Sequence, residues 1–148
     1  MSVKFVIEAD GGSRGNPGPA AFGAVVRDPE TGKIIAEAAD YIGTATNNVA
    51  EYRGLQAALE MVRDLNPEAH VEARLDSKLV VEQMSGRWKI KNEALRKLAI
   101  EIREILPMSA VHYSWIPREQ NTAADRLVNV SLDAVAAGRD PRIESRSQ

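Results

Sequence analysis

Residues 34–64 read IIAEAADYIGTATNNVAEYRGLQAALEMVRD, and the spacing of the apolar side chains changes within this stretch. Residues 34–41 follow a turn and are rich in apolar side chains, which predicts a strand. From about residue 47 to residue 64, apolar side chains recur at intervals of three and four, which predicts an amphipathic helix; they belong to Tyr52, Leu55, Leu59 and Val62. A chain that passes from strand to long helix in this way is typical of the α/β class.

Two further strands are expected upstream of this stretch, over residues 3–8 and 22–27. Between them lie residues 11–19, a turn-rich segment that contains four glycines and two prolines. Residues 28–33, with the sequence DPETGK, form a hairpin connection to the strand at residues 34–41. We therefore expect the first three strands to form an antiparallel meander.

Downstream of the long helix, the pattern predicts a strand at residues 70–75, a helix ended by Gly86, and a helix over residues 93–106 that is ended by Pro107. A strand at residues 111–116 and a helix at residues 122–137 follow. The order is βββαβααβα, and strand–helix–strand connections favour parallel pairing. The expected fold is therefore α/β: a five-stranded mixed sheet with helices on both faces, the first three strands antiparallel and the fourth and fifth parallel to the first. Residues 1–138 would form this single domain, and residues 139–148 a polar tail or linker.

The composition narrows the class of protein. The chain has 148 residues, about the length of one domain, and no cysteine, which excludes disulfides and thiolate metal sites. It has no apolar run long enough to span a membrane, and its start lacks the apolar segment of a secretory signal. We therefore expect a cytoplasmic protein without a membrane partner. The net charge is −2, but residues 74–103 carry 8 basic and 4 acidic side chains; this segment is either a phosphate-binding surface or an ordinary solvated face.

Four carboxylates are expected to converge at one edge of the sheet. Asp10 and Asp76 come where the first and fourth strands are predicted to end, and parallel strands bring their carboxyl ends to the same edge. Glu51 shares a helical stripe with Leu55 and therefore points toward the sheet, where a carboxylate needs a partner. Asp125 lies in the first turn of the last helix, where the chain returns to the same edge.

Converging carboxylates repel one another unless cations neutralise them. An all-oxygen site favours the hard cations Mg²⁺ and Mn²⁺, and two such ions about 4 Å apart can activate a water and stabilise the leaving oxygen of a phosphodiester. Simpler explanations exist for two of the acids taken singly. Asp125 is also a favourable partner for a helix dipole, and Asp76 also suits an ordinary helix start.

Four sequence blocks resemble the motifs of the type 1 ribonuclease H family, in the same order and spacing. They are DGGSRGNPGP at residues 10–19, with Gly23 after it, TNNVAE at residues 46–51, DS at residues 76–77, and NTAAD at residues 121–125. The resemblance covers residues 3–137 approximately. A single DG or DS pair is uninformative, whereas four blocks in order are specific.

The resemblance implies a role for each block. The metal-binding catalytic residues would be Asp10, Glu51, Asp76 and Asp125. Contacts to sugars and base edges in the minor groove would come from Gly11, Asn16, Asn47 and Asn48, and reading the ribose 2′-hydroxyl is how a protein distinguishes RNA from DNA. Thr46 and Asn92 resemble the family's pocket for a DNA phosphate. Asn47 also suits a helix N-cap, which is compatible with substrate contact.

The chain departs from many family members in two places. The loop before the last helix lacks the histidine that many members have there. Arg118 stands in this loop, as in some bacterial and archaeal members. We interpret Arg118 as a functional substitute that binds phosphate; the alternative is an arginine that is merely exposed to solvent. The chain is also too short for the extra basic helix of some members. The basic segment 86–91 is expected to contact the DNA backbone instead, through Arg87, Lys89 and Lys91, with Trp88 packed either against a sugar or into the core. Trp115 is expected in the core.

The resemblance implies an endonuclease that uses two Mg²⁺ ions, or Mn²⁺ in their place, to cut the RNA strand of RNA–DNA hybrids, leaving 5′-phosphate and 3′-hydroxyl ends. Two alternatives stay open: a noncatalytic hybrid-binding module, and an integrase- or resolvase-type nuclease of the same superfamily. Double-stranded RNA and RNA–DNA junctions are further candidate substrates. The chain is expected to be monomeric and is similar to the N-terminal domain of bacterial ribonuclease H–phosphatase fusions, in which the polar tail would be a linker.

Overall fold

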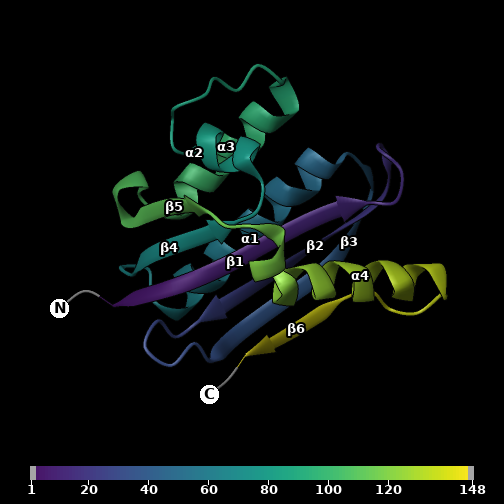
Figure 1. The fold of residues 1–148 in the computed structure, drawn as a ribbon, viewed down its shortest axis with the longest axis horizontal. Helices are drawn as coiled ribbons and strands as arrows, with labels where there is room; N and C mark the ends of the chain where they lie inside the picture. The colour runs from purple at the N-terminus through teal and green to yellow at the C-terminus, as the bar shows by residue number, and fades with distance from the viewer. Residues whose placement is uncertain (1–2, 147–148) are drawn as a thin grey trace.

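The protein, described here over residues 3–146 of a computed structural model, is a single mixed sheet with helices on both faces (Figure 1). The strands are β1 (Lys4–Ser13), β2 (Gly18–Arg27), β3 (Ile34–Ala45), β4 (His70–Leu75), β5 (Val111–Trp115) and β6 (Ile143–Arg146). The helices are α1 (Asn47–Leu65), α2 (Lys78–Met84), α3 (Glu93–Ile105) and α4 (Thr122–Ala136), with two single 3-10 turns, η1 (Met108–Ala110) and η2 (Arg118–Gln120).

The strands lie side by side in the order β5-β4-β1-β2-β3-β6. β1, β2 and β3 form the antiparallel meander that the sequence predicts, and β4 and β5 join it in parallel with β1. Helices cover both faces, as expected: α1 packs on one face, and α4 crosses the other (Figure 1). The predicted α/β class and the order of the first nine elements are confirmed.

The expected number of strands was one too low. Residues 143–146 form β6, which pairs antiparallel with β3 from Ala39 opposite Ile143 to Ala36 opposite Arg146. The end of the chain is held further by Ser131 in α4, whose hydroxyl donates to the carbonyl oxygen of Pro141 at 2.9 Å. The sequence of this strand carried no signal because only one of its four residues is apolar, and backbone pairing at a sheet edge needs no apolar pattern.

The first two strands are longer than predicted. β1 runs through the glycines to Ser13, and β2 begins at Gly18 rather than at residue 22. The turn-rich segment therefore narrows to residues 14–17. Glycine lowers the strand propensity of a sequence, but the pairing of Gly11 with Phe22 and of Gly12 with Ala21 holds the ladder together.

Two separate apolar layers hold the helices on the sheet. The larger layer packs Tyr52, Leu55 and Leu59 of α1 against Ile7 of β1, and extends to α2 and α3. The smaller layer, on the opposite face, packs α4 against β2 and β3 through Leu127, Val128 and Leu132. Trp115 was expected in the core, but its side chain is 53% exposed, because β5 is an edge strand.

None of the helices within residues 3–146 is long and apolar enough to cross a membrane.

Candidate functional site

The end of β4 opens a space beside β1. The parallel pairing of β1 with β4 stops at Ala9 and Leu75, whereas β1 stays paired with β2 as far as Ser13. Asp76 follows directly after β4, and Asp10 lies at the point where β1 loses its β4 neighbour. The prediction that the first strand ends at Asp10 was therefore wrong, but the two acids still meet, because it is β4 that ends here.

Two glycines let helices approach the sheet closely at this point. A Cβ on Gly11 would lie 2.1 Å from the backbone carbonyl carbon of Ala50 in α1, and a Cβ on Gly23 would lie 2.3 Å from the carbonyl oxygen of Ala124 in α4. A larger residue at either position would push the helix away from the sheet. Gly11 was predicted to contact substrate, and it lines the acidic cleft as well as packing against α1; its contact with substrate stays a prediction. The two contacts bring to the sheet the acids that follow in each helix, Glu51 and Asp125.

Three of the four predicted acids form a close cluster. Asp10, Glu51 and Asp76 each offer a carboxylate oxygen, and these oxygens lie within 4.8 Å of one another. Asp125 lines the same hollow of about 400 Å³ and adds to the negative field at Asp10. We call this hollow the acidic cleft; it is lined by Asp10, Gly11, Gly12, Ser13, Arg14, Asn47, Glu51, Asp76, Arg118, Asp125, Val128, Asn129 and Leu132.

Burial makes ionisation of the clustered acids unfavourable. Burial first, and then the nearby charge of Asp76, raises the pKa of Asp10 to about 8. The same two causes raise the pKa of Glu51 to about 7. Burial also raises the pKa of Asp76. Without a cation, the cluster of Asp10, Glu51 and Asp76 therefore carries less negative charge near neutral pH than the three acids would in water.

Several groups partly offset this cost. The backbone N–H of Gly11 donates to Asp10 Oδ1 at 2.9 Å. A hydrogen bond from the side chain of Ser77 lowers the pKa of Glu51, and one from the side chain of Asn121 lowers the pKa of Asp76. Arg118 lies 3.9 Å from Asp125, and its charge lowers the pKa of both Glu51 and Asp76. The predicted loop arginine therefore faces the acids, although its side chain is 82% exposed.

The donor set fits a divalent cation. All the groups that converge are carboxylate oxygens, the ligands that Mg²⁺ and Mn²⁺ prefer. Burial raises the pKa values of Glu51 and Asp76, and the charge of Arg118 lowers both. A bound divalent cation would favour the ionised acids.

A second, smaller hollow gathers four of the predicted substrate contacts. Asn16, Thr46, Asn48 and Asn92 line it together, at the junction of the β1–β2 turn with the first turns of α1 and α3. Thr46 and Asn92 are the N-caps of these helices and accept hydrogen bonds from Val49 N and Leu95 N. The hollow therefore lies at two helix N-termini, where the helix dipoles favour an anion.

Asn47 joins the two hollows. It is the first residue of α1, and the alternative that it caps this helix was wrong, because Thr46 does so. Its side-chain oxygen instead accepts from the backbone N–H of Ser13 at 2.9 Å, and its own backbone N–H donates to Asn16 Oδ1 at 3.1 Å. These bonds tie the start of α1 to the β1–β2 turn.

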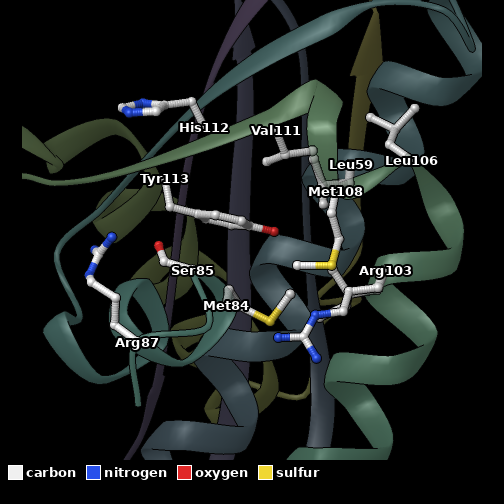
Figure 2. A pocket seen from close by; sticks show the side chains of 11 residues that line it. Leu59, Met84, Ser85, Arg87, Arg103, Leu106, Met108, Val111, His112 and Tyr113 are labelled. Carbon is white, nitrogen blue, oxygen red and sulfur yellow. The ribbon is translucent and has the colours of Figure 1, made fainter. Parts of the chain in front are cut away.

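The predicted basic segment is not part of the acidic cleft. Arg87 is held by an ion pair with Glu82 at 2.5 Å and lies at a different pocket, between α2, α3 and β5, beside Ser85 and Tyr113 (Figure 2). Trp88 is 46% exposed, so it is not packed in the core. Lys89 and Lys91 are exposed. The pocket in Figure 2 is mostly apolar and is lined by no carboxylate, so it does not resemble a metal site.

Sequence reasoning missed three residues that support the acids. Ser77 and Asn121 bond to carboxylates, and the indole N–H of Trp115 donates to the carbonyl oxygen of Asp76 at 3.1 Å. Ser77 and Asn121 stand in the DS and NTAAD blocks, one residue after and four residues before a predicted acid. Their position beside the acids was the available signal. Nothing in the sequence indicated the contact of Trp115.

Comparison with known proteins places these features in a family. The family model described as reverse transcriptase-like matches residues 8–131. The chain is 52% identical over 135 residues to the bifunctional protein Rv2228c of Mycobacterium tuberculosis, covering 90% of this chain and 37% of that protein. It is 45% identical over 128 residues to ribonuclease HI of Halobacterium salinarum, covering 84% of this chain and 62% of that protein. The chain thus spans less than two thirds of the length of these relatives.

Solved structures agree with the sequence comparison. The N-terminal RNase H domain of Rv2228c superimposes with a TM-score of 0.86, covering 93% of this chain and 99% of that one. LC11-RNase H1, solved in complex with an RNA/DNA hybrid, superimposes with a TM-score of 0.83 at 41% identity, covering 89% of this chain and 99% of that one.

Proposed function

Because this chain belongs to the type 1 ribonuclease H family, we propose that it is an endonuclease that hydrolyses the RNA strand of RNA–DNA hybrids. The observation that carries the proposal is the cluster of Asp10, Glu51 and Asp76, whose oxygens lie within 4.8 Å of one another in an open cleft. Buried acids this close are costly for stability and need a function to explain them. The structure of LC11-RNase H1 with an RNA/DNA hybrid supports the choice of substrate.

We assign the metal ligands to Asp10, Glu51, Asp76 and Asp125, with Mg²⁺ as the natural cation and Mn²⁺ as a substitute. A divalent cation bound there supplies Lewis-acid stabilisation of the charge that develops on the phosphodiester during hydrolysis. The four side chains hold and orient the cation, and the close packing of α1 and α4 on β1 and β2 keeps them in place. The products would be 5′-phosphate and 3′-hydroxyl ends.

Arg118 is the cationic residue that we assign to the reaction. It lies at the mouth of the acidic cleft, 3.9 Å from Asp125, on a side chain that is free to reach a bound phosphate. Arginine stays protonated near neutral pH, so its role is to bind a phosphate oxygen and not to transfer a proton. It would thereby orient the scissile phosphate over the acids.

The remaining contacts would distinguish the two strands. Asn47 lines the acidic cleft and Asn16 and Asn48 line the smaller hollow, where their side-chain amides would bond to ribose 2′-hydroxyls and base edges. Thr46 and Asn92 line the hollow at two helix starts, which suits a phosphate of the DNA strand. Further along, Arg87, Trp88, Lys89 and Lys91 would contact the DNA backbone. Gly11 would support these contacts indirectly, by keeping α1 close.

The noncatalytic alternative is disfavoured by the presence of all four acids. An integrase- or resolvase-type nuclease is disfavoured by the identity to ribonucleases H. Activity on double-stranded RNA or junctions, the monomeric state and the cytoplasmic location stay predictions. We place the end of the catalytic domain after β6 rather than at residue 138, since β6 completes the sheet.

The proposal is tested with a panel of end-labelled duplexes of one sequence: RNA–DNA, RNA–RNA and DNA–DNA. We expect cleavage of the RNA strand in the hybrid with Mg²⁺ or Mn²⁺, none of the DNA duplex, and none of any duplex in EDTA. Sequencing of the product ends checks the 5′-phosphate. Cleavage of the DNA duplex would favour the integrase or resolvase alternative, and hybrid binding without cleavage would favour the noncatalytic one.

A further inference from the structure

Asn121 is a fully buried polar residue directly behind the acidic cluster. It stands between η2 and α4, with 0% of its surface exposed. Its side-chain amide donates to the carbonyl oxygen of Ala9 at 2.9 Å, a bond between residues 112 positions apart. Ala9 directly precedes Asp10, so this bond links the start of α4 to the strand that carries the first acid.

The same residue contacts the other two segments of the cleft. Its side chain lies close to the Asp76 carboxylate and lowers the pKa of that acid, and its backbone carbonyl oxygen accepts from the N–H of Asp125 at 3.1 Å. Asn121 thus lies beside three acids, Asp10, Asp76 and Asp125, which come from β1, the end of β4 and α4.

Asn121 does not perform the usual role of its position. Asparagine at a helix N-cap normally accepts a hydrogen bond from a backbone N–H of the first turn. The side chain of Asn121 makes no such bond to α4, and its Oδ1 atom is buried without a partner among the described residues. An unpaired buried acceptor is costly. The amide is therefore oriented by the hydrogen bond that it donates to the Ala9 carbonyl oxygen, at the expense of helix capping.

Asp76 is also held from its backbone. The indole N–H of Trp115 donates to the Asp76 carbonyl oxygen at 3.1 Å, and the N–H of Ile116 donates to the carbonyl oxygen of Leu75 at 2.9 Å. These bonds fix the turn that leaves β4. The backbone of Asp76 is thus fixed by the end of β5, and its carboxylate lies beside the buried side chain of Asn121.

We propose that Asn121 is a positioning residue, which ties the start of α4, with Asp125, to the strand that carries Asp10, and thereby sets the affinity of the acidic cleft for its divalent cation. The inference rests on the proposed function for the identity of the cation. It goes beyond that function in assigning metal affinity to a buried side chain that is not itself a predicted ligand. Partners of metal ligands of this kind typically change metal affinity or activity about 10- to 100-fold when they are removed.

A purely structural role is the competing explanation, and α4 offers a matched control. Ser131 is also 0% exposed, and its hydroxyl also donates to a distant backbone carbonyl oxygen, that of Pro141, at 2.9 Å. Ser131→Ala removes one buried side-chain hydrogen bond from the same helix, at the end away from the acids. Both substitutions should lower the melting temperature, but only the change at Asn121 should affect metal binding.

The test is isothermal titration calorimetry of the whole chain with Mg²⁺ alone, for the wild type, Asn121→Ala and Ser131→Ala. We expect Asn121→Ala to raise the Mg²⁺ dissociation constant about 10- to 100-fold and Ser131→Ala to leave it unchanged. Steady-state cleavage of the hybrid should show a lower kcat for Asn121→Ala at low Mg²⁺, an unchanged KM for the hybrid, and recovery of kcat at high Mg²⁺. Recovery by metal distinguishes a positioning role from loss of folded protein.

Equal Mg²⁺ affinity for the wild type and Asn121→Ala, or an equal loss in Ser131→Ala, would overturn the proposal. If Asn121→Ala does not fold, Asn121→Ser, which keeps one donor on a shorter side chain, is titrated in its place and should also bind Mg²⁺ more weakly. Calorimetry needs no substrate. A wild-type chain that binds Mg²⁺ but cuts nothing would therefore refute the proposed function while still testing the role of Asn121.

Discussion

The acidic cleft places side chains where folding alone would not favour them. Asp10 is only 8% exposed and lies beside two other acids, and burial is the largest cause of its raised pKa. Proteins tolerate such groups at functional sites, because the same field that destabilises the empty site gives it affinity for a cation. The acids are thus expected to cost stability when the cation is removed.

This cost predicts how stability depends on pH in EDTA. The pKa of Asp10 rises from 3.8 to about 8 on folding, and that of Glu51 rises from 4.5 to about 7. A group whose pKa is raised by folding stabilises the protein fully below its unfolded pKa and loses that contribution as pH climbs to the folded value. The free energy of unfolding, measured with urea in EDTA, should therefore fall between about pH 4 and pH 8.

Asp10→Asn is the control for this dependence. The amide has nearly the shape of the acid but does not titrate, so the slope of stability against pH should become shallower, and the variant should be more stable than the wild type at pH 8 in EDTA. Saturating Mg²⁺ should also flatten the slope for the wild type. A stability that stays level or rises over this range in EDTA would contradict the burial of the acids.

A second prediction concerns the side chain of Arg118. Arg118→Ala should lower kcat on the hybrid by at least about 10-fold, a typical loss for a group that stabilises transition-state charge, and should hardly change the melting temperature, because its ion pair with Asp125 is exposed. Arg126→Ala, an exposed arginine of α4, is the matched control and should keep its activity. An Arg118→Ala enzyme as fast as the wild type would remove this residue from the site.

Among the elements, those with an apolar period were predictable and those without one were not. The periods of α1 and α3 predicted both helices almost to their ends, and the short apolar runs predicted β4 and β5. The extension of β1 through Gly11 and Gly12 was missed because the ladder with β2, a nonlocal interaction, overrides the low strand propensity of glycine. The four acids could be predicted because they stand in sequence motifs. The close packing at Gly11 and Gly23, which brings the acids together, could not be predicted, because it depends on nonlocal contacts.

β6 illustrates the same limit and can be tested by truncation. Removing residues 141–148 takes away the pairing with β3, the partner of Ser131 and the ion pair between Arg146 and Asp64. We expect the melting temperature to fall by several degrees, since about 1 kcal/mol corresponds to roughly 2–4 °C in a domain of this size. Cleavage at 25 °C should persist, because β6 lies at the sheet edge away from β4. An unchanged melting temperature would restore the prediction of a frayed tail.

The basic segment after α2 predicts a change in salt dependence. Lys89 and Lys91 are exposed, whereas Arg87 is paired with Glu82. Replacing both lysines by alanine should weaken hybrid binding and lower the slope of log K against log salt by about 0.7–0.9 for each phosphate that a lysine no longer neutralises. Lys4→Ala, at the other end of the sheet, is the control. The measurement is hybrid binding by fluorescence anisotropy at several salt concentrations. If the slope of log K against log salt is the same in the double variant and the wild type, the two lysines do not contact the DNA backbone.

For the whole molecule, the sheet order explains why one edge carries the site. β4 is short and parallel to β1, so its end leaves Asp10 without a neighbour on the β4 side, and α1 and α4 approach this gap from opposite faces (Figure 1). The acidic cleft is lined from β1, α1 and α4, and the smaller hollow from the starts of α1 and α3, so α1 borders both. Under the proposed function, a duplex lying across α1 would reach both hollows.

The decisive measurement asks whether the acidic cluster cuts the RNA strand of a hybrid. It compares single-turnover cleavage of an end-labelled RNA–DNA hybrid by the wild type and by Asp10→Asn, with hybrid binding measured in parallel. The wild type should cut the RNA strand with Mg²⁺, and Asp10→Asn should bind the hybrid with similar affinity while its cleavage rate falls by several orders of magnitude. If the wild type binds the hybrid but leaves the RNA strand intact, the chain is not the proposed nuclease. If Asp10→Asn cuts the RNA strand as fast as the wild type, the acidic cluster is not the catalytic site.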